Sequence, residues 1–292
     1  MPCLRASTGV LRAVRGELLR YVSRTKVMSK QKIQAIAFDF GNTLCPWDEE
    51  QYWQVTSATL EHICALSNGH SADSAYEVFS RVRDAESART LSRLLENDLV
   101  GILSDTAREM LGRPLDRSEL DKLIDAHVAA FVGVCKAPAG LVPMLDRLSQ
   151  KYRLALLSNY PLPKCIRLSL ENLGISKYFE FTAVSGDLGV IKPGQRMFRE
   201  ALSALNLPPE SVLFVGDDWI ADVVGACAAG MPCIHILDST ATRKARMMEG
   251  VFGAYLRKAL ELPELSCWRE AKPVAVLDSV LGLEKWLGGR QE

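Results

Sequence analysis

Short apolar runs alternate with helical stretches over most of this 292-residue chain, and that alternation limits its possible folds more than any other feature. Strands that alternate with helices form parallel sheets, with the helices packed on both faces. We predict strands at 33–38, 153–157, 180–184, 212–215, 233–237 and 274–277, and helices near 140–150, 162–173, 195–206, 220–229, 241–260 and up to about 287. The sequence therefore predicts an α/β protein with a parallel sheet core.

Polar side chains follow three of these predicted strands at the point where each strand ends. Asp39 follows the run that ends at Phe38, Ser158 and Asn159 follow the run that ends at Leu157, and Asp217 comes directly after Gly216. Parallel strands bring their carboxyl ends to one edge of a sheet, where open α/β proteins bind their ligands. We expect these side chains to converge on one site.

A lysine precedes a proline in the segment Gly189-Val190-Ile191-Lys192-Pro193-Gly194. A residue before proline is disfavoured in helical conformation, so Lys192 is expected in a loop just before the helix near 195–206. A fixed ammonium group at this edge of the sheet would complement the carboxylates.

Taken in order, these motifs resemble those of the haloacid dehalogenase superfamily of phosphohydrolases. The motif residues are Asp39, Ser158, Lys192, Asp217 and Asp222, and the resemblance covers most of residues 33–237. It implies a Rossmann-like core and an aspartyl-phosphate enzyme. In that family the first Asp is the nucleophile, so the implied role of Asp39 is nucleophilic attack on phosphorus.

The resemblance also implies a phosphoryl site and a magnesium site. Lys192 and Ser158, with Asn159 less directly supported, would hold the phosphoryl group. The expected ligands of Mg²⁺ are carboxylates of Asp39 and Asp217 and the backbone carbonyl of Gly41, since this ion prefers hard oxygen ligands. Asp222 is expected either to bind the ion, through water, or to orient Lys192.

Gly41 is the departure from the family pattern. Phosphatases of the family usually carry a second Asp two residues after the nucleophile, and it protonates the leaving oxygen. General acid catalysis contributes a factor of about 10² to 10⁴ in rate. The expected enzyme is therefore slow, or selective for leaving groups that need no proton. Asp48 and His127 are candidate replacements, although a helix-capping Asp and a packed core His are the simpler interpretations.

Two alternatives to a phosphohydrolase stay open. One is a binding or regulatory module that keeps the fold without turnover, which Gly41 favours. The other is a haloacid-dehalogenase-type hydrolase, which needs no metal and is disfavoured by Asp217 and Asp222. A phosphonatase is disfavoured, because that branch of the family forms a Schiff base with a cap lysine and no lysine occurs between Lys32 and Lys122. The Asp-Phe-Gly triplet at Asp39 lacks the accompanying motifs of a protein kinase.

The 118 residues between Asp39 and Ser158 are far more than one crossover needs, and their pattern is helical. We predict helices at 49–66, 72–88 and 98–111 and after Asp116, whose partner Glu119 resembles a capping box. The predicted division is a core at 33–45 and 138–292 and a helical-bundle cap domain at 46–137. In the resembled family such a cap covers the site.

The composition gives the chain no net positive charge that would attract polyanions. Lys plus Arg equals Asp plus Glu at 35 each, so the net charge is zero and nucleic acid is a disfavoured partner. Eight cysteines without C-x-x-C spacing favour a reducing compartment. We expect a cytoplasmic protein that acts on a small phosphorylated substrate without membrane binding. Residues 1–32 form a basic appendage, and organelle targeting by 1–28 is one interpretation; oligomeric state is not predicted.

Overall fold

The computed structural model describes residues 32–67, 71–237 and 258–289. Its centre is a six-stranded sheet in the order β3-β2-β1-β4-β5-β6, and every neighbouring pair is parallel. The strands are β1 (Ala35–Phe38), β2 (Arg153–Ser158), β3 (Phe181–Val184), β4 (Val212–Gly216), β5 (Cys233–Ile236) and β6 (Ala275–Leu277). The predicted α/β fold with a Rossmann-like parallel core is confirmed.

Helices cover both faces of the sheet, which explains why its strands are continuously apolar. Ile36 and Phe38 of β1 pack in one cluster with α6 (Leu141–Ser149), α7 (Pro163–Asn172) and α13 (Leu283–Gly288). Ala35 and Ala37 face the other way, toward α9 (Gln195–Leu205) and α10 (Gly225–Ala228). Successive strand residues point to opposite faces, so these two clusters sandwich the sheet.

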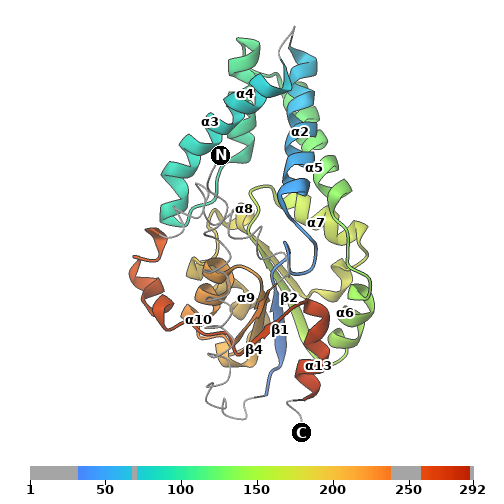
Figure 1. Cartoon of the computed structure of the whole chain (residues 1–292), viewed down its shortest axis with the longest axis vertical. Coiled ribbons are helices and arrows are strands. Elements are labelled where there is room, and N and C mark those ends of the chain that lie inside the picture. Colours follow the sequence, from blue (N-terminus) through green and yellow to red (C-terminus); the bar gives the residue numbers. More distant parts are fainter. Residues whose placement is uncertain (1–31, 68–70, 238–257, 290–292) are drawn as a thin grey trace, which may run out of the picture.

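The segment between β1 and β2 is helical, as predicted, and stands at one end of the sheet (Figure 1). Its helices are α2 (Glu49–Leu66), α3 (Ala72–Thr90), the short η1 (Leu91–Arg93), α4 (Leu99–Leu111) and α5 (Arg117–Val134). Helices α2, α3, α4 and α5 share their own apolar cluster, in which Ile63, Leu103 and Leu123 are almost fully buried. That this insert is a cap with boundaries at 46–137 stays a prediction.

Local capping signals set where the insert helices begin. Asp116 accepts the backbone N–H of Glu119 at 2.9 Å, and the Glu119 side chain accepts the N–H of Asp116 at 2.9 Å, which is the predicted capping box. Asp48 caps α2 in the same reciprocal way with Gln51. Such caps satisfy N–H groups that have no partner within the helix.

The remaining described elements are short turns of helix. They are η2 (Ser176–Tyr178), α8 (Ser185–Leu188), η3 (Pro209–Ser211), the π-helical turn η4 (Trp219–Val224), η5 (Pro263–Arg269) and η6 (Val280–Gly282). Most of the helix predicted at 241–260, and the basic segment 1–32 except its last residue, lie outside the described residues. Within the described part of the chain, no helix has both the length and the apolar character needed to cross a bilayer.

Candidate active site

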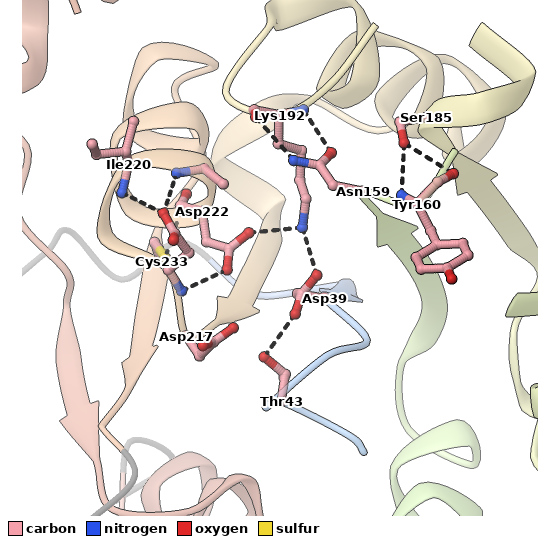
Figure 2. A network of polar contacts seen from close by, with 12 residues as sticks. Asp39, Thr43, Asn159, Tyr160, Ser185, Lys192, Asp217, Ile220, Asp222 and Cys233 are labelled. Atoms are coloured by element: carbon pink, nitrogen blue, oxygen red, sulfur yellow. Dashed lines mark hydrogen bonds and ion pairs between the residues drawn. The ribbon is translucent and has the colours of Figure 1, made fainter. Parts of the chain in front are cut away.

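Five of the predicted site residues lie close together in Figure 2, namely Asp39, Asn159, Lys192, Asp217 and Asp222, at the carboxyl ends of the central strands. Asp39 follows β1, Ser158 ends β2 and Asp217 follows β4. The strand order makes β1 the neighbour of both β2 and β4, so the chain reverses its direction of travel across the sheet here. A crevice at such a switch point is the usual ligand site of an open α/β sheet.

Asp39 opens a tight loop that fixes its carboxylate. Its own N–H donates to the carbonyl of Val215 at 2.9 Å, which continues the sheet by one bond. The N–H groups of Leu44 and Cys45 then donate to the carbonyl of Phe40 at 2.9 and 3.0 Å. The Thr43 hydroxyl donates to Asp39 Oδ2 at 3.1 Å. The loop therefore folds back so that the Thr43 hydroxyl contacts the carboxylate of Asp39 at the start of the loop.

Lys192 is the charged centre of the site. Its ammonium Nζ lies 2.7 Å from Asp39 Oδ1 and 2.7 Å from Asp222 Oδ1, and its side chain is 1% exposed. Burial alone would lower the pKa of Lys192, but the carboxylates of Asp222 and Asp39 raise it above its ordinary value. Burial raises the pKa of Asp39 to about 6, against the opposing charge of Lys192. Lys192 is thus held as a cation.

The backbone of Lys192 is held as firmly as its ammonium. The Asn159 side chain accepts the N–H of Lys192 at 2.7 Å through Oδ1 and donates to its carbonyl at 3.0 Å through Nδ2. The structure therefore places Asn159 against the lysine backbone, whereas the sequence placed it on the phosphoryl group. Ser158 is buried at the end of β2, beside Asn159.

A segment of the insert pairs with the loop that carries Lys192. The Ile191 N–H donates to the carbonyl of Leu94 at 2.9 Å, and the Glu96 N–H donates to the carbonyl of Gly189 at 3.1 Å. Between them, Leu95 and Val190 form an antiparallel bridge. The insert therefore contacts the core at a place remote from its two ends in sequence.

Asp222 contacts the Lys192 ammonium at 2.7 Å, which is the contact that its predicted orienting role requires, and that role stays a prediction. Its second oxygen accepts the N–H of Asp218 at 2.9 Å, and Asp222 is 1% exposed. This close approach requires Gly216, because a Cβ there would lie 2.3 Å from Asp222 Oδ2. Asp218 caps η4 by accepting the N–H groups of Ile220 and Ala221 at 2.8 and 2.7 Å.

Three carboxylates offer a set of oxygens that fits a divalent cation. One oxygen from each of Asp39, Asp217 and Asp222 lies within 4.8 Å of the other two. With Lys192 the ionised side chains sum to a charge of two negative units, since three carboxylates outweigh one ammonium. Mg²⁺ takes such oxygen ligands and would cancel that charge. Gly41 lies half-buried two residues after Asp39, so its predicted carbonyl ligand belongs to the same loop.

The two candidate replacements for the missing acid have structural roles. Asp48 caps α2. His127 is 6% exposed, and its ring contacts Thr59 Oγ1 through Nδ1 and the Tyr160 hydroxyl through Nε2, both at 2.9 Å. Thr59 donates its only hydroxyl proton to the carbonyl of Val55 at 2.7 Å, so it accepts from His127 Nδ1. His127 Nε2 therefore accepts from Tyr160.

Sequence reasoning missed the contacts that hold the charged groups in place. Thr43 was part of the quoted Asp39 loop, but a hydroxyl in a loop gives no sign of where it donates. Tyr160 has no motif around it, although its hydroxyl joins the core to α5. The doubled contact between Asn159 and Lys192 links residues 33 apart in sequence, and local patterns carry no signal for it.

Comparisons with known proteins agree with this geometry. Residues 33–230 match the family model described as haloacid dehalogenase-like hydrolase. The chain is 30% identical over 114 residues to the pyrimidine 5′-nucleotidase YjjG of Escherichia coli (strain K12), which covers 39% of this chain and 50% of that protein. The first curated relatives are thus matched over half of their length or less.

Two solved structures have the same fold at 20% sequence identity. The 2-haloacid dehalogenase of Pseudomonas syringae pv. Tomato DC3000 has a TM-score of 0.59, and the match covers 88% of this chain and 99% of that one. The HAD phosphatase of Thermococcus onnurineus has a TM-score of 0.57 with the same coverage. One fold therefore accommodates both kinds of chemistry, and the choice between them has to come from the site.

Proposed function

Because this chain belongs to the haloacid dehalogenase-like hydrolases, we propose that it is a magnesium-dependent phosphohydrolase that forms an aspartyl-phosphate on Asp39. Its substrate is a small phosphorylated molecule. The observation that carries the proposal is the buried Lys192 ammonium, shared at 2.7 Å by Asp39 and Asp222 beside a third carboxylate, Asp217. A cation and a divalent-metal ligand set around one carboxylate suit phosphoryl transfer.

The first step is attack by an Asp39 oxygen on phosphorus, in line with the leaving group. The new bond joins the carboxylate to phosphorus as the bond from phosphorus to the leaving oxygen breaks. Lys192 already contacts Asp39, so its positive charge lies where the equatorial phosphoryl oxygens arrive. Ser158 lies at the end of the adjacent strand and would donate a hydrogen bond to the same group. Water then cleaves the acyl phosphate and regenerates Asp39.

Asp39 and Asp217 would hold Mg²⁺, with the carbonyl of Gly41 and with Asp222 close by. When bound, the ion supplies positive charge that offsets the phosphate charge and the repulsion between that phosphate and Asp39. Asp222 has one oxygen on Lys192 and the other on the N–H of Asp218, so its main role is to orient the lysine. The ion would add its positive charge to that of Lys192 near the Asp39 carboxylate.

Gly41 makes the proposed enzyme selective for the leaving group. Residue 41 has no side chain to protonate the departing oxygen. Asp48 caps α2, and His127 is buried against Thr59. An alkoxide leaves poorly without a proton, whereas a phenolate or a carboxylate leaves readily. Aryl phosphates and acyl phosphates are therefore the expected class of good substrates, and simple alkyl phosphates the poor class.

A matched substrate panel tests this proposal. We expect turnover of aryl and acyl phosphates with Mg²⁺, loss of turnover with EDTA, and slower turnover of alkyl phosphates. Asp39→Asn should lower the rate by about a thousandfold or more, because it removes the attacking group. Equal rates on aryl and alkyl esters would contradict the role given to Gly41.

The same samples distinguish the two alternative functions. Chloride release from 2-chloropropionate that persists in EDTA would identify a dehalogenase and overturn the phosphohydrolase. Binding of a phosphate analogue that depends on Mg²⁺, without turnover of any ester or anhydride, would identify a binding module. Both outcomes are read on the native protein, with Asp39→Asn as the matched control.

A further inference from the structure

His235 is a buried histidine beside the three carboxylates, and the roles described so far leave it without a task. It lies in β5, one residue before that strand ends, and it is 6% exposed. Its partner across the sheet is Gly216, the last residue of β4, so His235 lies beside the point where the chain leaves the sheet toward Asp217. Its ring packs edge-on against Trp219, with the ring centroids 5.6 Å apart. The imidazole is therefore held in place.

The ring donates a hydrogen bond to the backbone of Asp217. His235 Nε2 lies 2.8 Å from the Asp217 carbonyl oxygen. A carbonyl oxygen can only accept, so Nε2 carries the proton and is the donor. The same peptide unit has one other polar group, the N–H of Asp218, which donates to Asp222 Oδ2 at 2.9 Å. The peptide that follows Asp217 is therefore held on both sides.

These two hydrogen bonds determine where the Asp217 carboxylate lies. A peptide unit is planar, so hydrogen bonds on its two opposite edges fix its orientation. On the other side of Asp217 the backbone is fixed by β4, which ends at Gly216. With both flanking peptides fixed, the Cα–Cβ bond of Asp217 has one direction, and it brings a carboxylate oxygen within 4.8 Å of oxygens of Asp39 and Asp222. Loss of one hydrogen bond would let the peptide rotate and displace that oxygen.

We propose that His235 is a positioning residue for the Mg²⁺ site, acting through the backbone of Asp217. The inference rests on the proposed function, in which Asp39 and Asp217 hold the ion. Mg²⁺ demands near-octahedral geometry, so a small displacement of one carboxylate lowers its affinity. Replacing a residue that orients a metal ligand typically lowers metal affinity by about 10- to 100-fold. His235 should thus set the Mg²⁺ concentration that the enzyme needs and have little effect on the chemical step.

A graded series at position 235 tests whether the donor and its reach matter. Glutamine carries an amide N–H about as far along its side chain as histidine Nε2, asparagine carries it one bond short, and leucine has no donor. We expect the Mg²⁺ Kd to rise about tenfold or more in His235→Leu and His235→Asn, and less than about threefold in His235→Gln. Calorimetric titration of the full chain without substrate measures these constants. Should His235→Leu fail to fold, the comparison of His235→Asn with His235→Gln still decides.

Ile234→Val controls for a loss of stability alone. Ile234 precedes His235 in β5, is fully buried, and points to the opposite face of the sheet. Its replacement removes one methyl group, which should lower the melting temperature in EDTA and leave the Mg²⁺ Kd unchanged. A purely structural role would make His235→Leu behave in the same way.

Kinetics give a second readout. In His235→Leu the half-saturating Mg²⁺ concentration should rise by the same factor as the Kd, while kcat at saturating Mg²⁺ stays within about threefold of the wild-type value. A fall in kcat without a change in the Mg²⁺ requirement would overturn the inference.

The binding measurements also separate this inference from the proposed function. If the wild type binds Mg²⁺ and both His235→Leu and His235→Asn bind it equally well, the inference fails and the proposed function stands. If His235→Gln loses as much affinity as His235→Leu, the hydrogen bond to Asp217 is not the cause, and the inference also fails. Absence of Mg²⁺ binding by the wild type would overturn both.

Discussion

At the scale of single residues, Lys192 shows how a fully buried ammonium group stays protonated. Two carboxylates hold its ammonium, and one amide side chain holds both polar groups of its backbone. A buried charge is strongly unfavourable unless it is paired and hydrogen-bonded. Removing Asp222 would leave the buried ammonium with one carboxylate fewer, and removing Asn159 would break the hydrogen bonds to the Lys192 backbone, so both residues should matter for stability and chemistry.

Replacing Gly41 by Asp should add the acid that the family pattern lacks. An added Cβ would lie 3.6 Å from the Trp47 Cβ, an ordinary van der Waals contact, so the loop has room for it. We expect Gly41→Asp to raise kcat/KM for alkyl phosphates by about tenfold or more, with a smaller change for aryl phosphates. Steady-state kinetics on both ester classes measure this.

Gly41→Ala is the matched control for that gain. It adds the same Cβ without a carboxyl group, so its ratio of alkyl to aryl rates should stay at the wild-type value. If alanine raised the alkyl rate as much as aspartate, proton donation would not be the cause.

Replacing Gly216 by Ala should disturb the lysine through Asp222. The new methyl group would sit 2.3 Å from Asp222 Oδ2, so the carboxylate has to move away from Lys192. Crowding of this kind costs about 1–3 kcal/mol of unfolding free energy. We expect that loss in urea denaturation, together with at least about a tenfold fall in kcat from misplaced charge.

Gly133→Ala gives the opposite result and controls for the substitution itself. Gly133 lies within α5 with open space around its Cα, so a methyl group meets nothing there. Alanine in a helix should raise the free energy of unfolding by about 0.5–1 kcal/mol and leave kcat unchanged. A loss at both glycines would show that the Asp222 contact is not the reason.

At the scale of elements, α2 and α5 are joined to the core by a chain of polar contacts. Tyr160 donates to His127, His127 donates to Thr59, and Thr59 donates to the carbonyl of Val55. Tyr160 also follows Asn159 directly in sequence, so this chain begins next to the residue that holds Lys192. The polar groups are mutually satisfied only while His127 is neutral.

His127 should make stability depend on pH in a defined window. Burial lowers its pKa in the folded protein to about 4, from about 6.5 in an unfolded chain. As pH falls from 6.5 to 4, the unfolded state binds a proton that the folded state does not, so stability decreases. The loss reaches about 3 kcal/mol at most and stops below pH 4.

Chemical denaturation at several pH values checks this window. His127→Gln should flatten the decline between pH 6.5 and 4, because no imidazole then titrates on unfolding. His62→Gln, on the same helix as Thr59, is the matched control, and the difference between the two variants is the measured quantity. If the free energy of unfolding still fell with pH as steeply in His127→Gln, His127 would not be the cause of the decline.

Element positions could be predicted from sequence wherever one local pattern was dominant. The helix at 49–66 and the capping box at Asp116 were predicted correctly because the periodicity and caps are encoded within one turn. The segment predicted as one helix at 220–229 instead begins as a π-helical turn. That turn places Asp222 against Gly216 and Lys192, and such a distant requirement has no local signature.

At the scale of the whole molecule, bound Mg²⁺ should stabilise the fold. An ion that binds only the folded state adds about 2.7 kcal/mol at a hundredfold excess over its Kd. We expect Mg²⁺ to raise the melting temperature by several degrees, and Asp217→Asn to abolish that rise. Thermal scans with and without EDTA measure it. A rise that survives in Asp217→Asn would place the ion elsewhere.

The sequence carried the architecture and the members of the site, but not how those members are connected. Apolar runs at strand spacing place Asp39, Ser158 and Asp217 on one edge, because parallel topology forces that convergence. The pairing of Leu94–Glu96 with Gly189–Ile191 joins residues about a hundred apart, which no periodicity reveals. The cap assignment stays a prediction, and so do the catalytic and metal roles given to individual residues.

That pairing gives the insert a third anchor besides its two covalent crossings. This third attachment lies at Val190, two residues before the lysine. Any movement of the insert that broke this pairing would release residues 189–191, which lead into Lys192. A movement of the insert and a displacement of the Lys192 ammonium from its two carboxylates would then be coupled.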